Sequence, residues 1–306
     1  VRSKDNSLAS TMQILTLKYG LDTGTPDLLH LVDVTNTSDP LNISVGNPDL
    51  KNSHTYKMGL FYMISPKNYM SNTVTVDFSV TDNALVRGYY YDKTTGVRYN
   101  KTYNVSGNNS LKAENVYNLQ FGRRKQFTLS SATVAGNIHS VDMVGTDGME
   151  PAPSKVDTRT LSENIRVSWQ IGKHSLSLNG VVSDRRTTSS RDGFNDINAT
   201  HYNYGVTGSF ALPAGFGIST DFRLYTRRGY GMRQLDTTDA VWNARATYTP
   251  RGGRWVFTLD GFDLLRRLNN IHYAVTATGR TVTYTNTLPR YILFSVQYRL
   301  NIQPKK

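Results

Sequence analysis

The sequence predicts an all-β chain whose antiparallel strands cross a membrane as a β-barrel. Three observations predict this fold class: apolar and polar residues alternate along many segments, short turns alternate with long polar connections, and tyrosine is abundant. No apolar run approaches the ~20 residues that a membrane-spanning helix requires. Only every second residue of a barrel strand faces lipid, so a hydrophobic content of 38% is compatible with this fold.

The alternation is clearest near residue 300. Successive residues of a strand point to opposite faces of the sheet, and a membrane barrel is apolar outside and polar inside. One face of this segment carries Ile292, Phe294, Val296, Tyr298 and Leu300. The opposite face is mostly hydrophilic, with Ser295, Gln297 and Arg299. We therefore expect a strand with one lipid-facing side.

The same pattern predicts about twelve strands. They lie near residues 9–20, 53–64, 70–91, 97–122, 124–139, 157–171, 174–187, 198–212, 215–228, 238–249, 253–264 and 288–300. Tight connections at 172–173, 212–215 and 249–253 alternate with long polar stretches at 140–157, 185–200, 227–238 and 265–288. Outer-membrane barrels have short periplasmic turns and long extracellular loops. We therefore expect residues 1–306 to form one transmembrane barrel domain in a bacterial outer membrane.

Aromatic residues flank the tight turns. The chain contains 19 Tyr, 11 Phe and 3 Trp, and amphipathic rings gather where a membrane meets water. The rings beside the turns are Trp169, Phe210, Phe216, Tyr248 and Trp255. We expect them to form an aromatic girdle at the periplasmic boundary.

Charged residues stand in the middle of several predicted strands, with apolar neighbours on both sides. They are Arg166, Asp221, Arg223, Arg245 and Asp260. The strands of a soluble β-sandwich also have one wet face, so an adhesin of that class is an alternative. Charges at the centre of a strand suit a hydrated lumen, and we expect these five residues to line it.

Arginine pairs mark strand ends that lead into the long loops. The formal net charge is +12, but the basic residues are dispersed and no helix concentrates them, which argues against nucleic-acid binding. Arg185-Arg186 and Arg227-Arg228 lie at such transitions. Because guanidinium groups pair well with phosphate, we expect contacts with lipopolysaccharide or with a ligand, and solvated loop charge is the alternative.

The sequence carries no catalytic or metal-binding motif that we recognise. It has no Cys, which excludes disulfides and thiolate metal sites, and its six His form no His-x-x-x-His pair. Neither a Gly-x-Ser-x-Gly elbow nor a P-loop occurs. The nearest catalytic candidate is His201, although a single His at a strand start is more often structural. We expect no metal, no cofactor and no enzymatic activity.

Two stretches resemble known families. The run Gly46-Asn47-Pro48-Asp49-Leu50-Lys51 resembles the G-N-P-x-L-K segment of TonB-dependent receptors, although Asn52-Ser53-His54 replaces the acidic residue usual after the Lys. In that family the segment follows an extracellular loop and leads into a descending strand. The ending at 288–301 resembles the last strand of the outer-membrane β-barrel family of Bacteroidetes-type bacteria. Its aromatic end is similar to the signal that the barrel-assembly machinery reads.

The resemblance implies a larger transporter. Plugged outer-membrane transporters have about 22 strands, roughly twice the number predicted here. We therefore expect the chain to be the C-terminal part of a receptor barrel, without the plug domain. The implied partners are outer-membrane lipid and lipopolysaccharide, the TonB complex through the missing N-terminal part, the barrel-assembly machinery through the last strand, and a surface lipoprotein or another chain that completes the barrel.

Import of a ligand through a TonB-energised mechanism is the function that the resemblance implies. A self-contained barrel of about twelve strands, acting as a porin or an outer-membrane enzyme, is the alternative. The long loops have a generic Ser, Thr, Asn and Arg composition, which leaves iron chelates, glycans and peptides open as ligands.

Overall fold

The computed structural model describes residues 11–145, 151–191, 193–230, 236–268, 271–276, 279–286, 288 and 290–300. The first two residues of the predicted strand at 9–20 lie outside this range. So do parts of the predicted loops at 140–157, 185–200, 227–238 and 265–288. No helix among the described residues is long and apolar enough to span a membrane.

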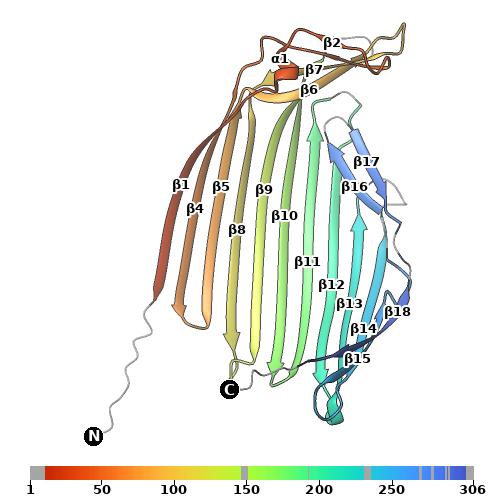
Figure 1. The fold of residues 1–306 in the computed structure, drawn as a ribbon. Coiled ribbons are helices and arrows are strands. Elements are labelled where there is room, and N and C mark those ends of the chain that lie inside the picture. Colours follow the sequence, from red (N-terminus) through yellow and green to blue (C-terminus); the bar gives the residue numbers. More distant parts are fainter. Residues whose placement is uncertain are drawn as a thin grey trace, which may run out of the picture.

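One antiparallel sheet of twelve strands forms a long curved wall (Figure 1), which confirms the predicted fold class. Each strand pairs with the preceding strand of the same sheet in chain order. The strands are β1 (Met12–Gly24), β4 (Ser53–Lys67), β5 (Met70–Asp82), β8 (Asn108–Phe121), β9 (Phe127–Val144), β10 (Ala152–Ile171), β11 (His174–Ser189), β12 (Ile197–Ala211), β13 (Phe216–Arg228), β14 (Thr238–Tyr248), β15 (Trp255–Phe262) and β18 (Tyr291–Tyr298).

Short turns lie at one end of the wall and longer connections at the other (Figure 1). The β12–β13 turn contains η1 (Pro213–Gly215), in which Gly215 has a φ of 85°. A Cβ on Gly215 would lie 2.0 Å from the carbonyl oxygen of Thr249, so only glycine fits this turn. The opposite end carries α1 (Leu28–Leu31), β2 (Thr35–Asn36), β3 (Asn42–Val45), β6 (Ala84–Tyr91), β7 (Arg98–Val105), β16 (Ile271–Thr276) and β17 (Gly279–Tyr284).

The predicted long strands at 70–91 and 97–122 are wrong, because the structure divides each into two. The chain turns at Asn83, with a φ of 52°, and at Gly107, with a φ of 107°. Beyond these breaks β6 and β7 leave the wall and join a four-stranded sheet in the order β2-β3-β7-β6, in which β3 and β7 are parallel. Short polar runs interrupt the polar–apolar alternation at both breaks, Thr81-Asp82-Asn83 at the first and Ser106-Gly107-Asn108-Asn109-Ser110 at the second, and the predicted strands were drawn across these turn signals.

The four-stranded sheet is attached to the outer end of β9. Ala84 and Val105 form a buried cluster with Val141, and Val86 and Met143 pack against it. Val141 and Met143 continue the apolar face of β9 beyond the wall's central part. The small sheet therefore covers apolar side chains that water would otherwise contact.

The Gly46–Lys51 segment, which carries the receptor-like motif, docks on β7. The side-chain amide of Asn47 donates to the carbonyl oxygen of Thr102 at 2.8 Å. Asn104 accepts from the amide of Lys51 and donates to the carbonyl oxygens of Lys51 and Asn83. At Gly46 a Cβ would lie 1.7 Å from the carbonyl oxygen of Val32. The motif is therefore structural: it joins the loop to the small sheet at the start of β4.

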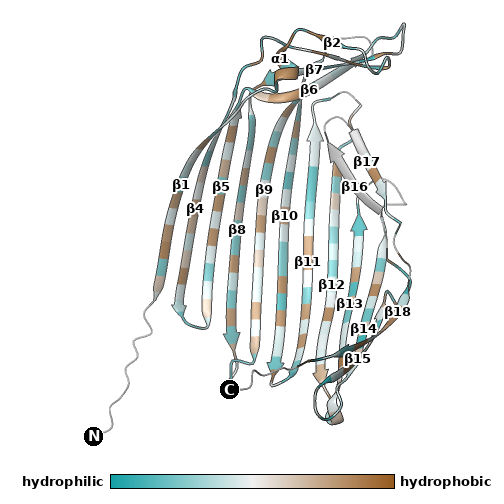
Figure 2. Ribbon diagram, in the orientation of Figure 1, coloured by the Kyte–Doolittle hydropathy of each residue, from teal (hydrophilic) through white to brown (hydrophobic). Residues whose placement is uncertain are grey.

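The strand register separates a polar face from an apolar face. One row across the sheet contains Ser168, Ser177, Thr207, Asp221 and Asn243, each directly opposite the next. The neighbouring row on the other face contains Val167, Leu178, Val206, Phe222 and Trp242. All five of these apolar side chains are exposed. The hydropathy colouring in Figure 2 shows the same alternation along the strands.

This arrangement differs from that of a soluble sandwich, which buries one face of each sheet. Among the described residues no large side chain is fully buried. The exposed apolar face requires a nonaqueous surrounding, and a lipid bilayer supplies one. The faces therefore support the membrane interpretation over the adhesin alternative.

The sheet is open in the structure. Strands β1 and β18 are its two edges and lie far apart in the order of pairing. Within the described residues β1 pairs with β4, β18 pairs with β15, and the two edges share no ladder.

Candidate functional site

The five charged residues expected in the lumen share the polar face. Arg166 lies opposite Asn179, Asn179 opposite Gly205, and Gly205 opposite Arg223. Asp221 stands two residues before Arg223 on β13, and therefore on the same face. Arg245 and Asp260 belong to this face too, since Arg245 lies two residues after Asn243, the partner of Asp221. The structure brings four of the five together on β13–β15, with Arg166 farther away on β10.

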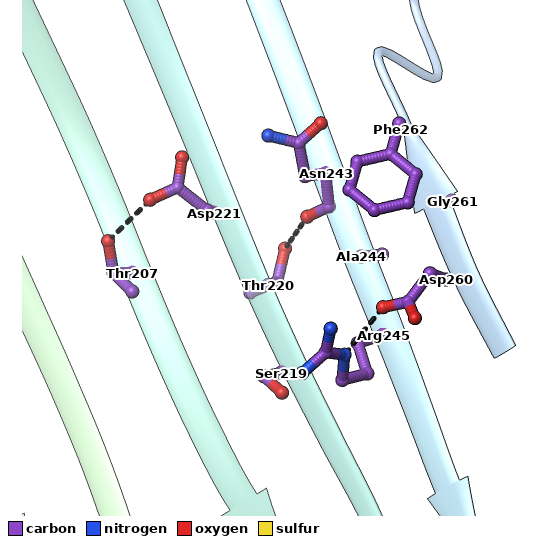
Figure 3. A pocket seen from close by; sticks show the side chains of 10 residues that line it. All are labelled: Thr207, Ser219, Thr220, Asp221, Asn243, Ala244, Arg245, Asp260, Gly261 and Phe262. Carbon is purple, nitrogen blue, oxygen red and sulfur yellow. Dashed lines mark hydrogen bonds and ion pairs between the residues drawn. The ribbon is translucent and has the colours of Figure 1, made fainter. Parts of the chain in front are cut away.

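Arg245 and Asp260 form an ion pair across β14 and β15. They are directly opposite in register, and Arg245 Nε donates to Asp260 Oδ1 at 2.5 Å (Figure 3). Asp260 is only 7% exposed, whereas the side chain of Arg245 remains 54% exposed. The pair thus holds a guanidinium group at the surface of the polar face while neutralising a buried carboxylate.

Asp221 and Arg223 form a second pair on β13. Arg223 Nε donates to Asp221 Oδ1 at 3.0 Å and Arg223 Nη2 donates to Asp221 Oδ2 at 3.1 Å. The hydroxyl of Thr207 on β12 donates to the same carboxylate at 3.0 Å (Figure 3). The carboxylate is held by three donors, so its orientation on the polar face is fixed.

A shallow pocket of about 240 Å³ lies beside the Arg245–Asp260 pair and Asp221. Its lining residues are Thr207, Ser219, Thr220, Asp221, Asn243, Ala244, Arg245, Asp260, Gly261 and Phe262 (Figure 3). Hydroxyl, amide, carboxylate and guanidinium groups stand among its lining residues, although most of its exposed surface is apolar. Among the described residues no group of three His, Asp or Glu side chains is arranged to hold a metal ion.

The polar face carries further charges that sequence reasoning missed. Lys57 on β4 pairs with Asp22 on β1, and Lys112 pairs with Glu114 on β8 at 2.9 Å. Asp77 on β5 lies opposite Lys112. The alternation along 74–80 already placed Asp77 on the hydrophilic side, so that signal was present in the sequence.

The arginine pairs at the outer strand ends split between the two faces. Arg185 and Arg227 lie on the polar face, where Arg227 is directly opposite His201. Arg186 and Arg228 point to the apolar face, because adjacent strand residues alternate. Arg228 donates to the carbonyl oxygens of Arg227 and Thr237, so its guanidinium is folded onto its own hairpin.

His201 has a structural partner. Its Nε2 is hydrogen-bonded to the hydroxyl of Tyr230 at 2.6 Å, and the two rings lie 5.7 Å apart. The imidazole is thereby tied to the β13–β14 connection.

The rings beside the short turns lie on the apolar face and contact one another. Phe216 stacks on Tyr248 with ring centroids 4.5 Å apart, and Trp255 lies 4.6 Å from Tyr298. Phe121 and Phe127 stack in the same way at the β8–β9 turn, at 5.2 Å. Ring pairs at several places along the short-turn end build a belt suited to a membrane–water boundary.

Polar side chains interrupt the apolar face near its middle. Glu163 on β10 accepts hydrogen bonds from the hydroxyls of Ser131 at 2.6 Å and Thr133 at 2.5 Å on β9. Asn115 donates to Asn72 nearby at 2.7 Å. These groups hydrogen-bond to one another, which lowers the cost of placing them on an apolar surface.

A wall of amphipathic antiparallel strands with a belt of rings defines an integral outer-membrane β-barrel protein. The chain matches the Outer membrane protein beta-barrel family over residues 9–298 and belongs to that family. The family places the protein in the bacterial outer membrane.

Among solved structures, the chain resembles the ferric yersiniabactin uptake receptor FyuA from Yersinia pestis. The TM-score is 0.46 and the sequence identity is 10%. The similarity covers 96% of this chain and 48% of the receptor, so the chain spans about half of the receptor's length. No curated protein matches the chain in sequence.

Proposed function

We propose that this chain forms part of the wall of an outer-membrane transport barrel and serves ligand import in the intact receptor. The observation that carries this proposal is the continuity of the polar face. On β13 alone, the inward side chains run from Ser219 through Asp221, Arg223 and Tyr225 to Arg227. At ~3.3 Å per residue, this single strand offers polar groups along most of a membrane's thickness.

The arrangement of charges supports a path rather than a binding pocket with one strong site. Arg185 and Arg227 stand at the outer end of the polar face, and the Asp221–Arg223 and Arg245–Asp260 pairs lie deeper. Each deep guanidinium is partly neutralised by its carboxylate, so a solute of either charge meets modest barriers. We propose that the five expected lumen residues line this path.

The open edges support placement of the chain in a larger barrel. An unpaired backbone group in hydrocarbon costs several kcal/mol, so β1 and β18 require partners in a membrane. We propose that further strands of the same receptor pair with them, and that the chain is its C-terminal portion. The resemblance of Gly46–Lys51 to the TonB-dependent receptor segment supports this placement, and that of the last strand supports a Bacteroidetes-type source.

The remaining partners follow from that placement. We propose that a plug domain and the TonB complex act through the rest of the receptor, and that the barrel-assembly machinery reads β18. A surface lipoprotein or a second chain is the other candidate for completing the wall. We propose a transport role rather than a catalytic one, because the catalytic candidate His201 is engaged by Tyr230.

Energised uptake separates this proposal from the porin alternative. The protein from the full reading frame is expressed in outer membranes, and uptake of ferric chelates, oligosaccharides and peptides is measured with and without a protonophore. The expected result is uptake of one of these three classes of solute, and this uptake stops when the protonophore collapses the proton gradient. Liposomes reconstituted with the protein are expected not to swell in arabinose. Rapid passive swelling by the intact protein would contradict the proposal and support a porin.

A further inference from the structure

Two arginines face each other on the apolar side of the wall near its outer end. Arg159 on β10 lies directly opposite Arg186 on β11, and both side chains are exposed. Asp157 and Thr188 are the next opposed pair toward the loops. These four side chains line a pocket of about 240 Å³. Only Arg186 was singled out by the sequence pattern.

Like charges placed directly opposite each other in a sheet are destabilising unless a group of opposite charge lies between them. Asp157 offers incomplete compensation, because it supplies one negative charge against two guanidinium groups, and its carboxylate is also hydrogen-bonded to His139 at 2.8 Å. Asp184, the next residue of the same face on β11 toward the membrane centre from Arg186, accepts from the hydroxyl of Thr200. Lys155 adds another positive charge on the same face of β10. The four side chains that line the pocket include two guanidinium groups and one carboxylate, so the pocket itself carries a net positive charge that an anion can balance.

The position of the cluster relative to the membrane identifies the kind of anion. Arg159 lies about ten residues above Trp169, which belongs to the belt at the short-turn end. Ten residues rise ~33 Å along a strand, and a tilt of ~40° reduces this to ~25 Å across the membrane. The apolar band of an outer-membrane barrel is also ~25 Å tall. Arg159 and Arg186 therefore sit where the headgroups of the outer leaflet begin.

The apolar residues below the cluster complete the site. On the same face, Leu161 lies one step toward the membrane centre from Arg159 and is opposite Asp184, while Val182 lies two steps from Arg186 and is opposite Glu163. Both apolar side chains are exposed. A lipid whose phosphate reached the two guanidinium groups would lay its acyl chains along these side chains. A free phosphate ion would gain nothing from that apolar surface.

We propose that Arg159 and Arg186 bind a phosphate group of the anionic glycolipid in the outer leaflet, lipopolysaccharide. Two guanidinium forks bind the phosphate oxygens in charge-assisted hydrogen bonds, and the hydroxyl of Thr188 is placed to add one more. The sites of the other arginines differ: Arg185 and Arg227 face the polar side, and Arg228 is folded onto its hairpin. The lipid site is independent of whether the barrel transports a ligand.

Lipid retention by the intact protein tests this site. The protein is purified in detergent, and its binding of lipid A carrying both phosphates is measured by native mass spectrometry. In Arg159→Gln/Arg186→Gln, binding weakens by about tenfold or more, since charge-assisted hydrogen bonds are lost. The charge-matched control is Arg123→Gln/Arg124→Gln, which removes two exposed arginines from the β8–β9 turn at the opposite end. This control binds lipid A as the wild type does.

Two competition arms distinguish the possible sources of the phosphate. Lipid A stripped of its phosphates binds at least about tenfold more weakly to the wild type, and millimolar inorganic phosphate fails to displace the intact lipid. Heat-modifiable migration in gel electrophoresis verifies that each variant is folded. Equal losses in both double variants would overturn the proposal, as would undiminished binding of phosphate-free lipid A. Complete displacement by inorganic phosphate would overturn the lipid assignment in favour of a free-anion site.

Discussion

Val206→Arg places a charge on the side of β12 that faces lipid. Val206 lies about four residues above Phe210 in the belt, which is ~13 Å along the strand and ~10 Å above the membrane boundary at ~40° tilt. This position is close to the midplane of a ~25 Å apolar band. An arginine there costs about 2–4 kcal/mol, which is roughly a 30- to 700-fold change in the folding equilibrium.

Thr207→Arg is the matched control, because residue 207 points to the polar face. Thr207 lies directly opposite Asp221, whose carboxylate would face the new guanidinium. The lost hydrogen bond from the threonine hydroxyl, worth about 0.5–1.5 kcal/mol, is offset by this new ion pair. We expect a change within about 1 kcal/mol of the wild type.

The assay is urea-induced unfolding of the intact protein in lipid vesicles, followed by tryptophan fluorescence. The two variants change neighbouring β-branched residues of one strand to the same amino acid. The change in net charge and in strand propensity is therefore closely matched between them. Equal destabilisation at both positions, or greater loss at 207, would refute the assignment of the two faces.

The other predictions concern the polar face and the loops. Asp260→Asn leaves the partner charge of Arg245 unbalanced and lowers stability by about 1 kcal/mol, measured by the same unfolding assay, while Arg245→Gln added to it restores much of the loss. Gly46→Ala drives a methyl group into the carbonyl oxygen of Val32, so residues 25–52 become more sensitive to limited proteolysis while the barrel remains folded. Hydrogen bonds from neighbouring groups, chiefly a side-chain amide, hold the pKa of the loop carboxylate Asp39 below its usual value of 3.8. Its stabilising effect is therefore present above pH ~3.8 and is lost as the pH falls through the folded pKa, which lower amide protection factors in that loop at low pH would reveal. Unchanged protection factors would contradict a capping role for Asp39.

The sequence predicted the faces of the strands because side-chain direction in a strand is a local property. Asp221 and Arg223 stand two residues apart, so they share a face whatever the register of their neighbours. The same rule places Arg185 and Arg186 on opposite faces of the sheet. The two arginines of such a pair therefore cannot contact the same group. It also places Glu163 with Ile165 on the apolar face, so the sequence alone predicts a carboxylate on that face.

The positions at which strands end were predicted less well than the faces of the strands. Short polar runs at 81–83 and 106–110 interrupt the alternation where the chain leaves the wall for the four-stranded sheet, but the predicted strands were drawn across them. The turn depends on a left-handed backbone at these positions and on burial of Ala84 and Val105 against Val141. Those contacts join residues far apart in the chain, so the local sequence does not predict that β6 and β7 join a second sheet.

From the sequence alone came the all-β class, the number of strands in the wall, the polar and apolar faces and the end at which the short turns gather. Each depends on residue spacing along one strand or one turn. The tertiary structure decided which charges meet: Arg245 finds Asp260, and Arg159 finds Arg186, because strand register sets the opposing residue. It also decided that β1 and β18 remain apart. Register and edge pairing are long-range properties of the assembled sheet, and no period within a single strand contains them.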